Sequence, residues 1–419
     1  MARRNLPVTQ PVNPRSLMPV AEARALSQVD LPQLGTETIA LGDAVGRVLA
    51  KVPVAKLTQP PFPASAMDGY ALRADDLIDN RAELEIVGES AAGHGYHEQL
   101  QPGTCVRIFT GAPLPPAANV IAIQENAQPL SDGRVRILKS EPQGRYIRPA
   151  GGDFEKGREL AAVGTRLTPQ ILALLASAGH TDITVARRPV VAVISTGDEL
   201  VSPGTIPGPD QIISSNAMGV IARVRAAGGE VIDLGIVADT KEAIEQAFGA
   251  ALAQGAHVVL TLGGASVGDH DLVKPVFEAM GGELDLYRIA MRPGKPFMVG
   301  RLKEADRELR LLGLPGNPIS SLVCTKLFVE PLVAKLQGAQ IVEGLHLGTL
   351  TTPLDANDER EDYTRCTATP RPDGGWDVQP FPKQDSSLLH VAAAANALLC
   401  RPAHQKAQPV GAQISFMFW

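Results

Sequence analysis

The chain has 419 residues, of which 44 % are hydrophobic, 20 % charged and 4 % aromatic, and its formal net charge is −6. The acidic balance and the scarcity of aromatics argue against a nucleic-acid-binding protein, and no apolar run approaches the roughly 18 residues of a membrane span. The length predicts several domains, and the 40 glycines and 34 prolines predict many turns between their elements.

The first part of the chain predicts a few helices and many short strands. Residues 1–14 have a basic start and several prolines without the apolar segment of a secretory signal, so we expect a mobile tail. A helix is expected over 17–28, and the apolar runs of 64–148, which glycine and proline separate, are typical of strands. A further helix is expected to begin after its cap, Thr168, and to end before Gly179.

From residue 187 the pattern changes to strands and helices in alternation, which is typical of a doubly wound parallel sheet. Asp239 and Thr240 are both placed to cap one of these helices. Strand-like runs return from residue 345 to the end of the chain. The expected strands of the alternating part lie at 190–194, 231–237, 257–262 and 309–312, and its helices at 217–227, 241–254, 271–280 and 319–335.

Glycine-rich loops stand where ligands bind in such a sheet, at the carboxyl ends of the strands. They are Ser195–Glu199, Gly263–Asp271, Arg292–Pro296 and Gly313–Pro318. Glycines let the backbone approach a ligand and turn its N–H groups inward, and helix N-termini favour anions. The third of these loops also brings two full positive charges. This combination predicts a site for a phosphorylated ligand.

The same loops carry the carboxylates Asp198, Glu199, Asp269 and Asp271, which repel a phosphate unless a cation lies between them. Hard divalent cations bind carboxylate and phosphate oxygens together, so the residues suggest a magnesium-assisted site. Simpler interpretations remain open for single features. The glycine pair can be an ordinary turn, the first two acids a solvated helix start, and Asp239 a helix cap.

Other polar segments indicate little when they are taken singly. Ser65–Ala71 and Arg107–Pro113 read as turns, and the His94-x-x-His97 pair reads as a surface loop, because no acid or cysteine accompanies it. The four cysteines lie far apart without a Cys-x-x-Cys pair. We therefore expect neither a disulfide framework nor a zinc cluster, and a cytoplasmic location fits.

The order of seven segments resembles that of the molybdopterin molybdenumtransferase family, which includes the E domain of gephyrin. The similarity is collinear from about residue 15 to residue 419. The segments are Ser-Ala-Met-Asp-Gly-Tyr-Ala at 65–71, Thr-Gly-Ala at 110–112, Gly-Gly-Asp at 151–153, Ser-Thr-Gly-Asp-Glu-Leu at 195–200, Gly-Gly-Ala-Ser-Val-Gly at 263–268, Pro-Gly-Lys-Pro at 293–296 and Gly-Leu-Pro-Gly-Asn-Pro at 313–318.

The resemblance implies a multidomain α/β plus β protein. Its central domain is a doubly wound, parallel-type α/β molybdopterin-binding domain. The others are an inserted β domain, an elongated N-terminal domain made of two chain segments, and a C-terminal β-barrel. The implied boundaries are 15–60 with 148–186 for the elongated domain, 61–147 for the inserted domain, 187–337 for the α/β domain and 338–419 for the barrel.

The resemblance also implies a transferase of molybdenum cofactor biosynthesis. Such an enzyme inserts molybdate into adenylyl-molybdopterin and releases AMP with the help of Mg²⁺. A homodimer would share each active site between two chains, and transient contacts with a molybdopterin adenylyltransferase and with cofactor-accepting enzymes would follow. Neither nucleic acid nor membrane is expected as a partner.

The family pattern assigns roles to residues of this chain. The catalytic set is Asp68 and Thr110 from the inserted domain, acting in trans, with Asp198, Glu199, Asp271, Arg292 and Lys295. Metal ligands are expected among Asp198, Glu199, Asp239 and Asp271. Substrate-binding residues are expected at Gly263, Gly264, Ser266, Gly268, Gly313, Pro315, Gly316, Asn317, Asp153, Arg365 and Ser386.

Two departures from the family pattern bear on these roles. Many relatives have lysine where this chain has Arg292, which keeps the charge but changes a point donor into a planar fork. Near Ser386 the serine-rich stretch of the family is reduced. Two other activities are alternatives: ATP-dependent adenylylation of molybdopterin, which would need only the central domain, and a receptor-clustering scaffold, for which we would expect a further domain and a long linker.

Overall fold

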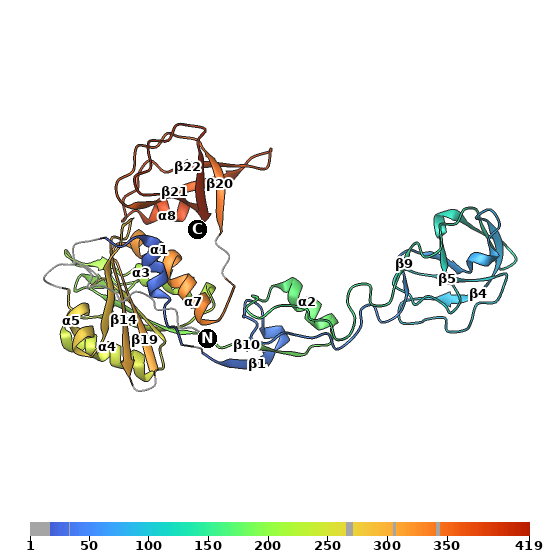
Figure 1. The fold of residues 1–419 in the computed structure, drawn as a ribbon, viewed down its shortest axis with the longest axis horizontal. Helices are drawn as coiled ribbons and strands as arrows, with labels where there is room; N and C mark the ends of the chain where they lie inside the picture. The colour runs from blue at the N-terminus through green and yellow to red at the C-terminus, as the bar shows by residue number, and fades with distance from the viewer. Residues whose placement is uncertain (1–16, 33, 265–270, 305–306, 341–343) are drawn as a thin grey trace, which may run out of the picture.

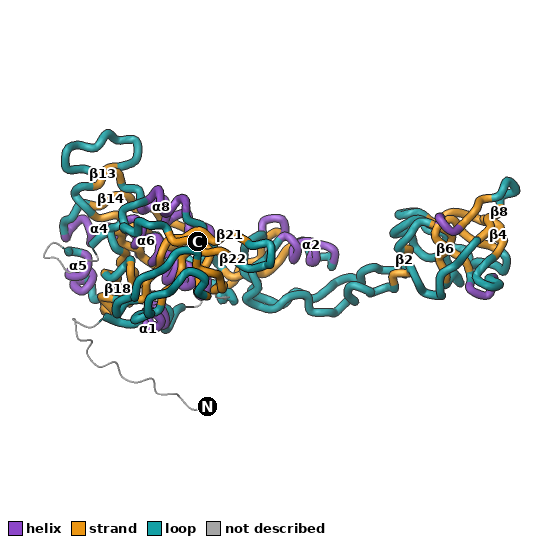
Figure 2. The backbone as a smooth tube through the Cα atoms, turned by 90° about the horizontal axis from the view of Figure 1, so that it is seen from above, coloured by secondary structure: helices purple, strands orange, loops and turns teal. Residues whose placement is uncertain are grey.

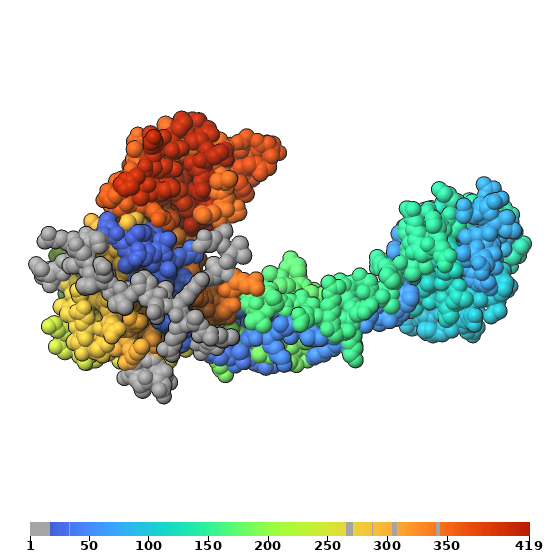
Figure 3. Space-filling view, viewed as in Figure 1, coloured from blue at the N-terminus to red at the C-terminus, as the bar shows by residue number. Residues whose placement is uncertain are grey.

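The computed structural model describes residues 17–32, 34–264, 271–304, 307–340 and 344–419, so the predicted tail at 1–14 lies outside the described residues. Figure 1 shows an elongated molecule with an α/β domain and a β-barrel at one end and a second β domain at the other. A narrow arm joins the two ends (Figure 3). Among the described residues, no helix has the length and apolar character needed to cross a bilayer.

The central domain is built on a mixed sheet with the strand order β14-β11-β15-β19-β18-β16. The first four strands are parallel, as predicted. Strand β18 is antiparallel to both of its neighbours, β19 and β16. The sequence did not predict that antiparallel edge. The bounds are β11 (Val190–Thr196), β14 (Glu230–Val237), β15 (Val258–Leu262), β16 (Glu283–Arg288), β18 (Pro296–Glu304) and β19 (Arg307–Leu314).

Helices cover both faces of this sheet because successive side chains of its central strands point to opposite sides. Val191 and Val193 of β11 pack with α3, α6 and α7, whereas Ala192 and Ile194 pack with α4 and α5. The predicted cap Thr240 accepts a hydrogen bond from the N–H of Ala243 at 3.3 Å. The helices are α3 (Asn216–Ala226), α4 (Lys241–Ala253), α5 (Val273–Ala279), α6 (Pro318–Cys324) and α7 (Glu330–Leu336).

The expected helix at 319–335 is present, because the backbone is helical without a break from Pro318 to Leu336, with two local departures from a regular capped helix. Asn317 makes no side-chain capping bond, and a π-helical turn at Thr325–Val329 separates α6 from α7. Pro331 has no N–H to donate to the carbonyl four residues earlier, so a regular helix loses a bond there. A π turn is one way in which a helix absorbs such an interruption.

The arm consists of two chain segments that run side by side (Figure 2). Strand β1 (Thr36–Ala40) pairs antiparallel with β10 (Asp182–Ala186), and α2 (Pro169–Ser177) packs beside them. Thr168 caps α2 by accepting from the N–H of Ile171 at 3.3 Å, as the sequence predicted.

The first helix packs on the α/β domain, whereas the resemblance implies residues 15–60 as part of the elongated domain. In α1 (Val20–Ser27), the side chains of Val20 and Ala23 are buried in the core of the α/β domain. Met18 also forms a β-bridge with Ile289 of that domain. The apolar face of α1 thus covers the central sheet, and the arm begins only after it.

The far end of the molecule is a six-stranded β domain with the order β6-β3-β5-β4-β8-β7. The chain enters and leaves it through the short pair β2 (Ala64–Ser65) and β9 (Ile147–Arg148). The strands are β3 (Gly69–Leu72), β4 (Ala82–Ser90), β5 (Thr104–Ile108), β6 (Val120–Ile123), β7 (Ala127–Pro129) and β8 (Arg134–Ile137).

The C-terminal domain is a closed five-stranded barrel, because β21 pairs with both β22 and β23. The two-residue strand β17 (Met291–Arg292) of the central domain adds to β21 in parallel. The other elements are β20 (Leu345–Leu350), β21 (Glu361–Pro370), β22 (Trp376–Pro380), α8 (Leu389–Ala394), β23 (Ala397–Arg401) and β24 (Gln413–Phe418).

Candidate active site

Three glycine-rich loops meet at the carboxyl edge of the parallel strands. The N–H of Gly263, after β15, donates to the carbonyl of Leu314 in β19 at 3.2 Å. A methyl group on Gly263 would lie 2.6 Å from the carbonyl oxygen of Thr196 in β11 and is therefore excluded. Gly316, in the loop after β19, packs against the same glycine. The sequence-predicted loops after β11, β15 and β19 thus form one surface.

The turn at Gly263–Gly264 requires glycine at both positions. The φ angles are +97° and +64°, in the left-handed region that side-chain-bearing residues rarely adopt. A Cβ on Gly264 would also overlap the Val273 side chain of α5. The turn therefore keeps the backbone exposed beside the N-terminus of α5, where N–H groups can receive an anion.

Gly264→Ala is expected to lower substrate turnover about tenfold, because the added methyl displaces the turn and misplaces its N–H groups. Val273 must also move, so we expect a loss of roughly 1–3 kcal/mol in stability. Activity assays and thermal melts measure the two effects. Gly249→Ala, at a helical glycine with open space around it, is the matched control. An unchanged activity in the Gly264 variant would contradict a binding role for the turn.

Three carboxylates gather at the ends of the neighbouring strands β11 and β14. The N–H of Asp239 donates to Oδ1 of Asp198 at 3.3 Å. Burial, and then the nearby Asp198 and Glu199, raise the pKa of Asp239 above its ordinary value. A like-charge cluster of this kind is disfavoured in the absence of a cation, and perturbed carboxylates are typical of functional sites.

The structure decides between the alternatives left open for these acids. Thr240, not Asp239, supplies the cap of α4, so Asp239 is free of that structural role. Asp198 and Glu199 are exposed and lead into the short strand β12 (Leu200–Val201), which pairs with β13 (Ile212–Ile213), so they do not begin a helix.

The donor set of this cluster fits a magnesium ion that its ligand completes. Within the described parts of the chain, no three His, Cys, Asp or Glu side chains are close enough to enclose a metal by themselves. Magnesium usually takes one or two protein carboxylates and fills its remaining positions with water and phosphate oxygens. Asp271 precedes α5, and its Oδ1 accepts from the N–H of Val273 at 3.2 Å. Ser266, Gly268 and Asp269 lie outside the described residues.

Two hydrogen bonds at the carboxyl edge of the parallel strands were not predicted from the sequence. Nδ2 of Asn216, at the start of α3, donates to the carbonyl of Gly316 at 2.6 Å and fixes the loop before α6. The carbonyl of Ser386 accepts from the N–H of Ile319 at 3.0 Å, so a barrel segment reaches the N-terminus of α6. Asn216 belongs to none of the glycine-rich loops, so no motif indicated it.

The expected barrel residue Arg365 lies close to this segment. It is 1 % exposed, its Nη2 donates to the carbonyl of Asp385 at 3.1 Å, and its Nε has no hydrogen-bond partner. Burial lowers the pKa of this guanidinium.

The two predicted cations of the loop Arg292–Pro296 differ in their surroundings. Lys295 is exposed, whereas Arg292 contacts Asn357, Asp358 and Asp362 of the barrel.

Asp68 and Thr110 form a unit of their own in the β domain at the far end of the same chain (Figure 1). Both the N–H and the hydroxyl of Thr110 donate to Oδ1 of Asp68 at 2.8 Å, and these bonds lower the pKa of Asp68. Arg107 stacks over Tyr70 and Phe109 beside them. Asp153 is exposed, and its N–H donates to the carbonyl of Gln59 at 3.1 Å. Within one chain, the structure does not bring these residues to the acidic cluster.

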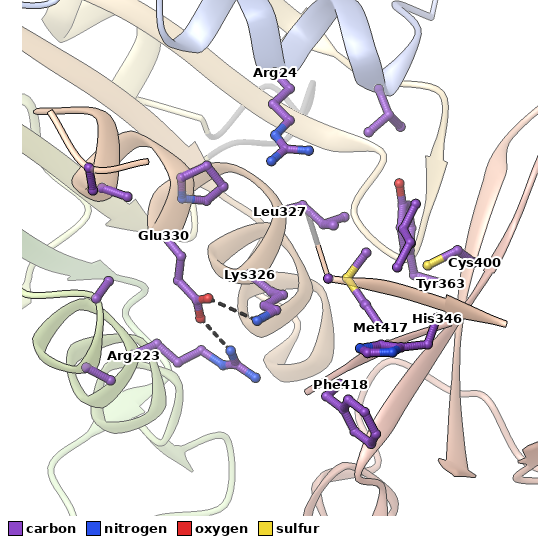
Figure 4. A pocket seen from close by; sticks show the side chains of 18 of the residues that line it. Arg24, Arg223, Lys326, Leu327, Glu330, His346, Tyr363, Cys400, Met417 and Phe418 are labelled. Carbon is purple, nitrogen blue, oxygen red and sulfur yellow. Dashed lines mark hydrogen bonds and ion pairs between the residues drawn. The ribbon is translucent and has the colours of Figure 1, made fainter. Parts of the chain in front are cut away.

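A cavity of about 850 Å³ lies elsewhere, between α1, α3, α7 and the barrel (Figure 4). Glu330 in its wall pairs with Arg223 at 2.5 Å and with Lys326 at 3.3 Å. None of the site residues predicted from the sequence lines this cavity.

Comparison with known proteins covers nearly the whole chain. Residues 18–179 match the family model of the MoeA N-terminal region (domain I and II), 192–335 that of a probable molybdopterin binding domain, and 348–419 that of the MoeA C-terminal region (domain IV). A molybdopterin molybdenumtransferase of Haemophilus influenzae is 36 % identical over 381 residues, which cover 90 % of this chain and 92 % of that protein.

Other relatives agree. A molybdopterin molybdenumtransferase of Nostoc sp. is 36 % identical and covers 80 % of this chain and 78 % of its own length. The crystal structure of the molybdopterin biosynthesis MoeA protein of Pyrococcus horikoshii OT3 superposes with a TM-score of 0.80 at 27 % identity, covering 96 % of this chain and all of that one.

Proposed function

Because the chain belongs to the molybdopterin molybdenumtransferase family, a group of transferases in molybdenum cofactor biosynthesis, we propose that it inserts molybdate into adenylyl-molybdopterin and releases AMP. One observation supports this above the others. A glycine turn suited to a phosphate and a cluster of carboxylates suited to a cation lie at the same edge of one sheet.

The residues divide the work by their chemistry. Gly263 shapes the turn, the backbone at Gly264, Gly316 and Asn317 receives the phosphate end of the pterin, and the ammonium of Lys295 attracts molybdate or phosphate oxygens. Water adds its oxygen to the adenylyl phosphorus as the bond from this phosphorus to the bridging oxygen breaks, so AMP leaves and the pterin keeps its terminal phosphate. The two dithiolene sulfurs then replace one oxide of molybdate, which leaves as water with the two thiol protons. Positioning and charge neutralisation suffice for such a transfer, so no protein nucleophile is needed.

One or two of the carboxylates Asp198, Glu199, Asp239 and Asp271 would hold Mg²⁺, which would neutralise phosphate charge when it is bound. Burial and the neighbouring acids disfavour the ionised form of Asp239 in the free protein. A bound cation would therefore stabilise the ionised carboxylate of Asp239. Through the cation, these side chains position the pyrophosphate of the substrate. They also leave the reacting phosphorus accessible to an incoming oxygen.

We place the shared active site in a homodimer. Asp68 and Thr110 lie at the far end of the arm from Lys295 in the same chain, so they can serve one site only if a second copy supplies them (Figure 1). The four free cysteines fit a reducing cytoplasm, where a molybdopterin adenylyltransferase would deliver the substrate and acceptor enzymes would take the product.

The test uses the purified protein with adenylyl-molybdopterin, molybdate and Mg²⁺, and it measures AMP and pterin-bound molybdenum. We expect both products to appear together. Removal of divalent cations with a chelator should lower both at least ~100-fold, and Mg²⁺ should restore them. Full activity after chelation contradicts the role of the acids. Release of pyrophosphate from ATP and molybdopterin, without AMP formation from the adenylylated substrate, would favour the adenylyltransferase alternative.

Lys295→Ala is expected to lower AMP release about 100-fold, because a preorganised positive charge beside the transferred group is lost. Lys303→Ala removes another exposed lysine, near the opposite end of β18, and serves as the matched control with unchanged activity. Equal rates in the two variants would remove Lys295 from the proposed site.

A further inference from the structure

The central domain and the barrel are joined close to the proposed site by a very short strand. β17 pairs with β21 over two residues only, Met291 with Glu361 and Arg292 with Asp362. The N–H of Glu361 donates to the carbonyl of Ala290 at 2.9 Å. Three positions after Arg292, the chain presents Lys295. The way in which the barrel holds β17 therefore bears directly on where that lysine lies.

The two terminal nitrogens of the Arg292 guanidinium contact three barrel side chains. Its Nη2 donates to Oδ2 of Asp362 at 2.9 Å and to Oδ1 of Asn357 at 3.1 Å, and its Nη1 lies 3.4 Å from Oδ2 of Asp358. The carboxylate of Asp362 holds the pKa of Arg292 above its usual value. These bonds orient the guanidinium towards the barrel, so moving it to contact a substrate anion would break charge-assisted hydrogen bonds.

The barrel partners are themselves fixed, so they form a rigid receptor for the guanidinium. Arg360 donates to both oxygens of Asp358, at 2.6 and 3.3 Å, and Nη1 of Arg401 lies 3.6 Å from Asp362. Nδ2 of Asn357 donates to two barrel carbonyls, and this residue is buried.

The other side of the loop is anchored in the α/β domain. Gly294 has a φ of +110°, and a methyl group there would lie 2.8 Å from Sγ of Cys324 in α6. The carbonyl of Lys295 accepts from the N–H of Ile289 at 3.1 Å. The loop is thus held between the barrel and α6, with the side chain of Lys295 left exposed.

We propose that Arg292 is a positioning residue that clamps the barrel to the loop carrying Lys295, instead of a charge that contacts the substrate. The clamp consists of Arg292, Asn357, Asp358 and Asp362. The expected effect of the clamp on activity rests on the proposed function, in which Lys295 acts on the substrate. It explains why a fork-shaped arginine suits this position, since a lysine cannot reach three barrel acceptors with the same geometry.

Activity separates the clamp from a substrate contact. Arg292→Ala and Asp362→Ala are each expected to lower AMP release about tenfold, and the double variant no further, because both break the same coupling. Arg292→Lys should fail to restore full activity. If Arg292 touched substrate, its loss would exceed that of Asp362→Ala, the two losses would multiply, and lysine would rescue. Any of these three results overturns the proposal.

Amide hydrogen exchange provides a readout that needs no substrate. The N–H groups of Ile289 and Glu361 are expected to exchange at least ~10-fold faster in Arg292→Ala and Asp362→Ala than in the unmodified chain. Arg371→Ala is the matched control, because Arg371 follows the other end of β21, where it binds Asp373 and Thr349. It should leave both amides protected.

The two readouts keep the clamp and the proposed function apart. Unchanged exchange in Arg292→Ala overturns the clamp, whatever the activity of the chain. Faster exchange with undiminished AMP release overturns its positioning role. If the unmodified chain forms no AMP while the amides respond as expected, the proposed function fails and the clamp between the domains stands.

Discussion

Replacing Asp239 with asparagine is expected to lower AMP release on the order of 10³-fold and, at the same time, to stabilise the ligand-free protein slightly. The two effects have one cause. Asp239 is held beside Asp198 and Glu199 in a partly buried position, where its negative charge is disfavoured. The amide keeps the shape of the side chain but carries no charge for a cation.

The stability effect has a defined dependence on pH. The pKa of Asp239 is raised in the folded protein, so ionisation at neutral pH costs stability, and this cost disappears as the pH falls through the raised pKa towards the ordinary value of 3.8. The variant should therefore melt about 1–2 °C higher at pH 7. The difference should shrink as the pH approaches 4, which thermal melts at several pH values would measure.

Asp233→Asn is the matched control, because Asp233 lies on β14, the strand that leads to Asp239. Asp233 is exposed on β14, and its Oδ1 accepts from the N–H of Gly235 at 3.0 Å, which an asparagine oxygen can also do. We expect neither activity nor melting temperature to change. A loss of stability in Asp239→Asn, or a melting difference that grows as the pH falls, would contradict an ionisation cost that arises from burial of Asp239 and from the neighbouring acids.

The sequence predicted the parts of the fold that repeat a local pattern. The runs that became β11 and β15 are apolar on both faces, and helical patterns lie between the predicted strands, so a parallel sheet follows from this alternation. Thr168 and Thr240 cap their helices as expected, because a cap depends on a few neighbouring residues.

Features that depend on distant neighbours were not predicted. Strand β18 runs antiparallel to both of its neighbours, β19 and β16, and its sequence contains no sign of which edge of the sheet it joins. The helix α1 packs on the α/β domain through Val20 and Ala23, although it precedes the arm in the chain. The sequence of α1 indicates an apolar face, but it does not specify which domain this face will cover.

The candidate site shows the same division. The loops at Gly263 and Gly316 could be grouped because parallel strands end at one edge, and the structure brings them into contact. Asn216 and the carbonyl of Ser386 complete that edge through single long-range hydrogen bonds. Such bonds carry no spacing pattern. Likewise, Arg292 was assigned by its charge, and only its three barrel partners indicate another role.

Mixing two inactive variants is expected to restore about a quarter of the unmodified activity, if each active site takes Asp68 from one chain and Lys295 from the other. Asp68→Asn should by itself lower AMP release on the order of 10³-fold, and Lys295→Ala about 100-fold. When the two variant chains assort at random, half of the dimers contain one of each. Every such dimer has one site with both lesions and one site with none.

The arrangement of the described residues makes this test specific. Asp68 is held by Thr110 in the far β domain, so both belong to the same half of a shared site, whereas Lys295 belongs to the other half. Co-expression of Asp68→Asn with Thr110→Val should therefore stay inactive, because each site of the mixed dimer then carries one lesion. Mass spectrometry of the intact dimers confirms that chains have mixed. Mixed dimers of Asp68→Asn and Lys295→Ala that remain inactive would contradict a site shared between two chains, and activity in the Asp68→Asn with Thr110→Val mixture would contradict the pairing of these two residues.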